Sequence, residues 1–121
     1  MSGLLSPYGA TGGNGNKAYQ CSGCSAVVTY SDRLLPVGET YRHLFVNPLG
    51  IAFEFYTFSS CPGVEAEGAA TDQHTWFPGY WWRFAFCHSC GQHLGWLYEA
   101  VSRQTRPGEF WGLLITHIFA R

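Results

Sequence analysis

The chain has 121 residues, of which 12% are charged, and a formal net charge of −1 at pH 7. This length predicts one domain, and so weak a charge offers no basic field for a phosphate backbone, so nucleic acid is not an expected partner. No apolar run reaches the roughly 20 residues that span a bilayer, and the N-terminus lacks the basic and apolar parts of a signal peptide, so we expect a soluble, cytoplasmic protein without a membrane partner.

The beginning of the chain differs in composition from the rest. Residues 1–17 are rich in glycine and carry almost no large apolar side chain. Such a segment cannot bury enough surface to offset the entropy of ordering it, which predicts a flexible N-terminal tail. The predicted folded domain covers residues 18–121.

The folded part reads as mostly β. A single helical turn is expected from Ser31, ended by Pro36, and Phe53 and Phe55 alternate with polar neighbours so that they share one face. Residues 61–72 hold proline and glycine and are expected to form a loop. Strands are expected at residues 26–30, 43–46, 51–58, 82–86, 93–98 and 110–119.

Two C-x-x-C pairs carry the strongest signal in the sequence. Cys21 with Cys24, and Cys87 with Cys90, each place two sulfurs on one side of a tight turn. Four thiolates complete a closed tetrahedral zinc site, so we expect one structural Zn²⁺ that joins distant parts of the domain. The alternatives are two disulfides or two chance pairs.

Aromatic residues reach 17% of the chain, more than a core of this size needs. Trp76 lies in a loop that contains Pro78 and Gly79, whereas Trp82 and Trp96 lie on strands on either side of the second cysteine pair. Because strands joined by a turn can pair, these indoles can face one small space. We interpret the three tryptophans as an apolar box with a polar opening, the alternative being that they are ordinary core residues.

In these motifs the chain resembles the thalidomide-binding domain of cereblon, the CULT domain, over almost the whole predicted fold. The resemblance implies a β-tent fold, in which two antiparallel sheets are pinned by Zn(Cys)4. The matching segments are Cys21 and Cys24, residues 34–36, 45–48 and 74–80, Cys87 and Cys90, and residues 93–96 and 110–112.

The resemblance also implies a ligand, because domains of this family hold a cyclic imide between three tryptophans. Here these would be Trp76, Trp82 and Trp96, with Tyr98 as the floor. The carbonyl and ring of His74 and the backbone N–H of Trp76 would contact the imide edge. Asn47 and Pro48 would line the entrance.

Several ligands share that edge. Glutarimides of the thalidomide type, uracil-like rings and hydantoin-like rings all present carbonyl, N–H and carbonyl in sequence. A C-terminal cyclic imide formed from asparagine or glutamine is a peptide-borne version of the same ring.

Cereblon's preceding domain and its helical segment for a ubiquitin-ligase adaptor are not recognised in this chain, so no adaptor site and no ligase function are expected.

We expect a binding module rather than an enzyme. Methionine sulfoxide reductases of the B type share a zinc-pinned β architecture, but they need a nucleophilic cysteine late in the chain, and no cysteine follows Cys90. The remaining Cys61 is expected near the surface without a role.

An aromatic box can also bind methylated ammonium groups, but such cages usually add a carboxylate. Glu99 is expected to be exposed beside the box, and His93 to lie near the zinc or at the surface.

Overall fold

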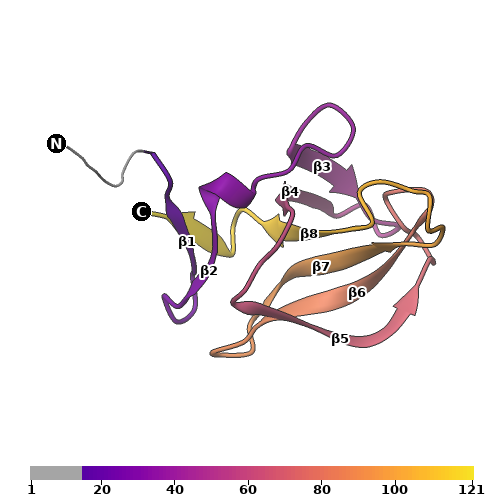
Figure 1. Ribbon diagram of the computed structural model, residues 1–121. Helices are drawn as coiled ribbons and strands as arrows, with labels where there is room; N and C mark the ends of the chain where they lie inside the picture. The colour runs from indigo at the N-terminus through magenta and orange to yellow at the C-terminus, as the bar shows by residue number, and fades with distance from the viewer. Residues whose placement is uncertain (1–14) are drawn as a thin grey trace, which may run out of the picture.

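The computed structural model describes residues 15–121. Within them, nine strands form two antiparallel sheets, and the one helical element is a short 3-10 helix, which confirms the predicted all-β fold (Figure 1). The smaller sheet has the order β2-β1-β9 and the larger one the order β3-β4-β8-β7-β6-β5. None of the helical structure in this part of the chain is long and apolar enough to cross a membrane.

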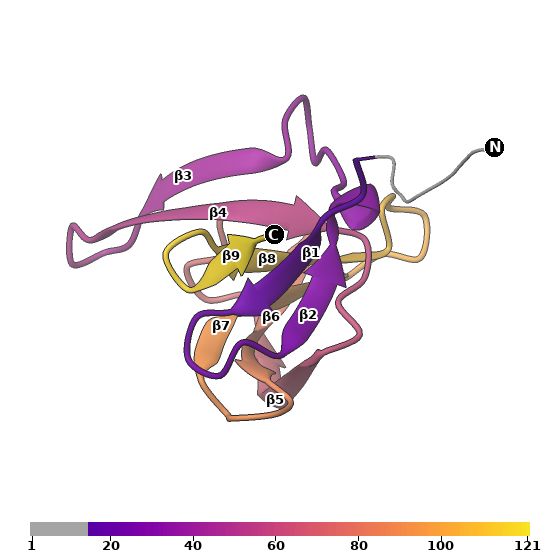
Figure 2. The ribbon, with the colours of Figure 1, turned by 90° about the vertical axis from the view of Figure 1, so that its left-hand side faces the viewer.

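The chain passes from the smaller sheet to the larger one and back again. The 3-10 helix η1 (Ser31–Arg33) leads from the smaller sheet to the larger one. Figure 2 shows the smaller sheet in front of the larger one. The strands are β1 (Ala18–Cys21), β2 (Val27–Tyr30), β3 (Arg42–Val46), β4 (Ala52–Phe58), β5 (Val64–Thr71), β6 (Tyr80–Cys87), β7 (His93–Ala100), β8 (Glu109–Leu114) and β9 (Ile118–Ala120).

The larger sheet has two different faces. In the pairing of β6 with β7, Trp82 lies opposite Tyr98 and Phe84 lies opposite Trp96. Paired residues point to the same side of a sheet, and alternate residues along a strand do so too, so these four aromatic side chains share one face. The other face carries residues such as Ala85 and packs on the smaller sheet. The buried residues of the core between the two sheets are Cys21, Val28, Phe58, Cys61, Val64, Ala85, Cys87, Leu94, Leu113 and Ile118.

The aromatic face is covered by loops rather than by a second sheet. Leu35 and Val37, which follow η1, pack on it, and so do Trp76 and Phe77 from the loop between β5 and β6. Gly112 lies in the middle of this face, where an added Cβ would come within 2.8 Å of the Phe55 ring. A glycine at this position therefore lets the aromatic rings pack directly over the sheet.

Two expectations about the elements were wrong. Residues 61–72 are not a loop, because β5 occupies Val64–Thr71 and pairs with β6 as an edge strand. The apolar run 110–119 is not one strand. A turn in which the His117 N–H donates to the Leu114 carbonyl (3.0 Å) divides it into β8 and β9, which belong to different sheets.

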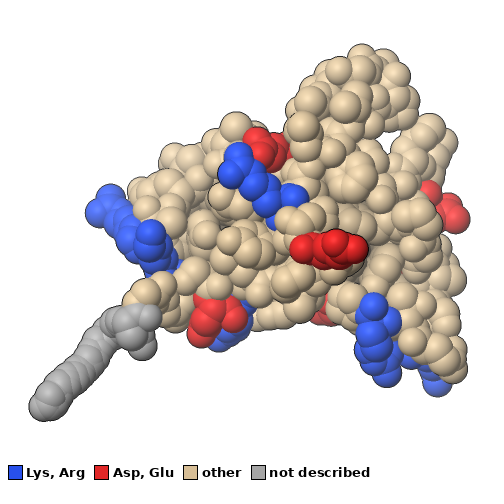
Figure 3. Space-filling view, turned by 90° about the horizontal axis from the view of Figure 1, so that it is seen from above, with Lys and Arg blue, Asp and Glu red and all other residues tan. Residues whose placement is uncertain are grey.

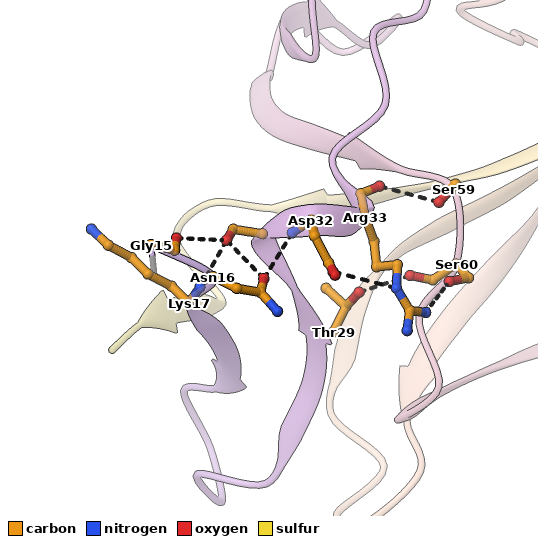
Figure 4. A network of polar contacts seen from close by, with 9 residues as sticks. Gly15, Asn16, Lys17, Thr29, Asp32, Arg33, Ser59 and Ser60 are labelled. Carbon is orange, nitrogen blue, oxygen red and sulfur yellow. Dashed lines mark hydrogen bonds and ion pairs between the residues drawn. The ribbon is translucent and has the colours of Figure 1, made fainter. Parts of the chain in front are cut away.

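The last residues of the predicted tail contact the folded domain, as Figure 4 shows. The backbone N–H of Lys17 donates to Ser31 Oγ (2.8 Å), and that of Asp32 donates to Asn16 Oδ1 (3.0 Å). These contacts tie the chain just before β1 to η1. Residues 1–14 of the predicted tail lie outside the described residues.

Candidate zinc centre and aromatic cavity

The first cysteine pair lies in a tight turn, the first zinc turn (residues 21–26), which follows β1. The N–H of Cys21 donates to the Ala26 carbonyl (2.9 Å), and the N–H of Ser25 donates to the Cys21 carbonyl (2.8 Å). The N–H of Gly23 also donates to Cys21 Sγ (3.3 Å). Ser25 has a φ of 67°, a left-handed backbone conformation that residues other than glycine rarely adopt.

The second zinc turn (residues 87–92) repeats this backbone pattern at the end of β6. The N–H of Cys87 donates to the Gln92 carbonyl and the N–H of Gly91 to the Cys87 carbonyl, both at 2.8 Å. Gly91 takes the place of Ser25 and has a φ of 80°. Both turns need a left-handed residue directly after the second cysteine, and the second turn meets this need with glycine.

The two turns bring all four sulfurs together, within 4.8 Å of one another. Cys21 Sγ lies 3.7 Å from Cys90 Sγ, and Cys24 Sγ lies 3.7 Å from Cys87 Sγ. A disulfide would need about 2.05 Å. With Zn–S bonds of about 2.3 Å, the sulfurs of a tetrahedral site lie roughly 3.8 Å apart. These four cysteines form the predicted zinc site, which joins the smaller sheet at β1 to the larger sheet at β6.

A side chain of the second turn also reaches the first turn. Gln92 Nε2 donates to Ser22 Oγ (3.2 Å), and Gln92 Oε1 lies 3.9 Å from Cys21 Sγ. A Cβ on Gly23 would displace this side-chain amide from its present position. Burial raises the pKa of the Cys21 thiol to about 12, whereas the Ala26 backbone N–H lowers the pKa of Cys24 to about 7. Zinc binds thiolates, so it has to displace the proton of Cys21.

A cavity of about 380 Å³ opens on the aromatic face of the larger sheet. This volume lies at the lower end of the range for small-molecule sites. All seven residues predicted to contact a ligand line it. The complete lining is Asn47, Pro48, Phe53, His74, Trp76, Trp82, Phe84, His93, Trp96 and Tyr98.

The three tryptophans, here called the tryptophan cage, do not form one packed cluster. The Trp76 and Trp96 rings meet edge to face at 5.1 Å and 83°. Trp82 packs its ring on Phe84 instead, at 5.1 Å. Its indole N–H donates to the Gln73 carbonyl (2.9 Å), which fixes its orientation. The cage therefore consists of a perpendicular Trp76–Trp96 pair and a separately anchored Trp82.

The cavity loop (residues 72–79) supplies backbone polar groups at the cavity. Its turn is held by Thr75 N–H, which donates to the Asp72 carbonyl (3.1 Å). His74 has a φ of 58°, a second left-handed residue that is not glycine. Throughout residues 15–121, the His74 carbonyl and the Trp76 N–H have no hydrogen-bond partner. An acceptor and a donor two residues apart are thus left open on a strained loop.

Asn47 lines the cavity and also stabilises a turn. Its Oδ1 accepts hydrogen bonds from the backbone N–H groups of Leu49 (3.0 Å) and Ile51 (2.9 Å) and so holds the turn between β3 and β4. Its NH2 group has no partner in the described chain. The amide therefore has two donor hydrogens available beside the cavity.

Three lining residues were not predicted as part of the site: Phe53, Phe84 and His93. Alternation could have found Phe84, because it follows Trp82 by two residues on the same strand. His93 was expected near the zinc or at the surface, but its ring packs on Trp96 at 5.6 Å. Its Nε2 lies 2.9 Å from the Gly95 carbonyl, and burial lowers its pKa, so the ring is neutral near pH 7.

Two residues named in the alternatives do not lie where they were expected. Glu99 is half-buried rather than exposed, and it pairs with Arg83 at 3.0 Å on the face of β6 and β7 opposite the cavity. Cys61 is not at the surface; only 4% of it is exposed, in the core between the two sheets. Burial raises the pKa of its thiol strongly.

Comparisons with known proteins agree with this architecture. The family model described as Yippee zinc-binding/DNA-binding/Mis18, centromere assembly, matches residues 17–118. Among solved structures, the crystal structure of the Mis18 "Yippee-like" domain aligns with a TM-score of 0.59 and 14% identity, over 88% of this chain and 95% of that one. At this identity the likeness concerns the fold alone.

Curated relatives include cereblon from several animals. The chain is 36% identical to cereblon of Gallus gallus over 77 residues, which are 64% of this chain and 17% of that protein. It is 39% identical to cereblon of Danio rerio over 69 residues, 57% of this chain and 16% of that protein. Cereblon of Drosophila persimilis is 29% identical over 98 residues, 78% of this chain. The chain thus spans about a sixth of the length of these relatives.

Proposed function

This chain belongs to the Yippee-Mis18 family of zinc-binding domains, and on that basis we propose that it is a ligand-binding module of the cereblon CULT type, which holds a neutral cyclic imide in the tryptophan cage. The zinc stabilises the fold, and the cavity binds the ligand. No chemical step is part of the proposal.

The observation that carries the proposal is the open donor and acceptor on the cavity loop. The His74 carbonyl can accept the imide N–H, and the Trp76 N–H can donate to an imide carbonyl. Neither group has a partner in the described part of the chain, so a ligand that completes both hydrogen bonds gains specificity as well as affinity. The methylene carbons of the ring would contact the tryptophan walls.

The electrostatic surroundings favour a neutral ring over a methylated ammonium group. The residues that line the cavity include no carboxylate. Glu99, the acidic residue close to the cage in sequence, is on the opposite face and already paired with Arg83. A cation in the cavity would have aromatic faces as partners but no counter-charge.

The position of Cys61 argues against a reductase function. The thiol is buried between the sheets and does not line the cavity. Because the thiolate is the reactive form, a buried thiol with a strongly raised pKa is a poor nucleophile. The remaining four cysteines form the zinc site.

The family description also names DNA binding, which we do not propose for this chain. Seven lysines and arginines stand against eight acidic residues. On the face seen in Figure 3, blue and red side chains are few, some of them lie side by side, and most of the surface is uncharged. Binding to a phosphate backbone depends on clustered positive charge, which this balance does not supply.

The ligand in the cell can be free or peptide-borne. A C-terminal cyclic imide on a protein carries the same imide edge as glutarimide and attaches to its chain through the ring. Asn47 and Pro48, in the turn between β3 and β4, would meet the attached chain at the entrance.

A fluorescence titration tests the proposal, because three tryptophans line the cavity. Glutarimide, uracil and hydantoin should change the emission saturably, whereas trimethyl-lysine and a short DNA duplex should not. Tighter binding of trimethyl-lysine than of any imide would favour the cation reader, and salt-dependent binding of the duplex would favour a nucleic-acid partner.

A further inference from the structure

The hydroxyl of Tyr98 is a buried polar group without a partner. Only 1% of this residue is exposed, and no hydrogen bond to its hydroxyl occurs within residues 15–121. Tyr80, in the same aromatic layer, provides a contrast, since its hydroxyl donates to the Pro107 carbonyl. A phenol is usually hydrogen-bonded when it is buried. Burial also raises the pKa of Tyr98, so its hydroxyl remains protonated and can donate.

The Tyr98 ring lies among aromatic neighbours on the cavity side of the sheet. The Tyr98 ring stacks on Phe110 at 5.0 Å and meets the edge of Phe77 at 4.8 Å. Neither phenylalanine can accept a conventional hydrogen bond. Tyr98 also lines the cavity, so a molecule in the cavity can supply the missing acceptor.

We propose that the Tyr98 hydroxyl selects cyclic imides with a hydrogen-bond acceptor on the ring edge opposite the imide nitrogen. This inference rests on the proposed function. The imide edge faces the cavity loop at His74 and Trp76, whereas Tyr98 belongs to strand β7 of the sheet. A ring that spans from the loop to the sheet presents its opposite edge to Tyr98.

The consequence for specificity follows from the cost of unpaired polar groups. A plain glutarimide places a methylene group on that edge and leaves the hydroxyl unpaired. A site with a buried hydrogen-bond donor binds a ligand without the matching acceptor less tightly than a ligand that has it. The protein therefore recognises two edges of the ring. A ring with only carbon on the edge opposite the imide nitrogen is not its best ligand.

Two rings of equal size test this selection. Glutarimide has a methylene group opposite the imide nitrogen, and morpholine-3,5-dione has an ether oxygen there. Both are titrated calorimetrically into the zinc-loaded wild-type protein, Tyr98→Phe and the control Tyr80→Phe. Zinc content and melting temperature show whether each variant is folded.

The wild type and Tyr80→Phe should bind morpholine-3,5-dione about 10-fold more tightly than glutarimide, and Tyr98→Phe should lose this preference while it binds glutarimide at least as well as the wild type. An unchanged preference in Tyr98→Phe, or no preference in the wild type, would overturn the assignment of Tyr98 and leave imide binding standing. Failure of both rings to bind the wild type would overturn the proposed function and this inference together.

Discussion

Trp82 and Cys87 lie on the same strand, β6, with their side chains on opposite faces of the six-stranded sheet. Cys87 belongs to the core between the sheets, whereas Trp82 lines the cavity on the aromatic face. One strand therefore supplies a ligand for the metal and a wall of the cavity. The sheet separates the two sites, so each can be altered without the other.

Removal of one zinc ligand should unfold the domain. Cys90→Ser is expected to lose its zinc, because three thiolates remain, and structural zinc contributes on the order of 10 kcal/mol, comparable to the net stability of a whole domain. Elemental analysis and thermal melting measure this. Cys61→Ala is the matched control and should keep one zinc per chain. A Cys90→Ser protein with its zinc and melting temperature intact would contradict the site.

The left-handed residue of the second zinc turn should be sensitive to substitution. Gly91→Ala is expected to destabilise the protein by about 1 kcal/mol, because Gly91 has a φ of 80° and alanine is strained there. Urea unfolding of the zinc-loaded protein measures the change. Gly108→Ala is the control, since a Cβ there meets nothing within 4 Å and its φ is not left-handed. Equal stability of the two variants would contradict this reading of the turn.

These turns show what the sequence could predict. The C-x-x-C spacing implies the turn and the metal through local geometry alone, and the alternation of Phe53 and Phe55 correctly places both on the aromatic face. Strand β5 was missed because its glycine, alanines and glutamates have low β propensity, and only its pairing with β6 makes it a strand. A break inside the apolar run 110–119 could not be found, since strands buried in two different sheets have the same composition.

The cavity shows the same limit. The tryptophans and the cavity loop could be predicted from their motifs and from the family resemblance. His93 could not be placed, because an extra residue at Leu94 shifts the register between β6 and β7 and turns the His93 ring to the aromatic face. The burial of Cys61 depends on the packing of two sheets, which no local pattern encodes.

Unfolding should depend on the protonation of His43. Only 8% of this residue is exposed, its ring packs among Phe45, Phe55 and Phe77, and burial lowers its pKa. The unfolded chain therefore binds more protons below the ordinary histidine pKa of about 6.5, and stability should be full above that pH and fall as the pH drops through and below it.

The comparison of wild type with His43→Gln isolates this contribution, because the zinc thiolates titrate in both proteins. Urea unfolding at pH values from about 5 to about 7.5 should give a smaller loss of stability on acidification in the variant. Parallel pH dependences in the two proteins would rule out a role for His43.

The cage should be separable from the metal by mutation. Trp82→Ala removes a wall of the cavity and should abolish measurable imide binding while the protein keeps its zinc. Trp81→Ala is the control, because Trp81 lies next in the sequence, on the opposite face, and does not line the cavity. Titration and elemental analysis of both variants measure the two properties. Equal imide binding by both would place the ligand elsewhere.

Ligand binding should protect the cavity loop from hydrogen exchange. The Trp76 N–H has no partner within residues 15–121, so it should exchange quickly without ligand and slowly when an imide carbonyl accepts its hydrogen bond. Amides of β5 that already pair with β6 serve as the internal control and should change little. An unprotected Trp76 amide at saturating ligand would mean that the loop does not read the imide.

The central claim is that the cavity reads the imide edge, and a calorimetric titration of the zinc-loaded protein with glutarimide and N-methylglutarimide tests it most directly. Glutarimide should bind in the micromolar range, about −8 kcal/mol, and the N-methyl compound should not bind measurably, because it lacks the N–H for the His74 carbonyl and places a methyl group there. Equal affinities for the two compounds would mean that the cavity recognises only shape and apolar surface, and would contradict the claim.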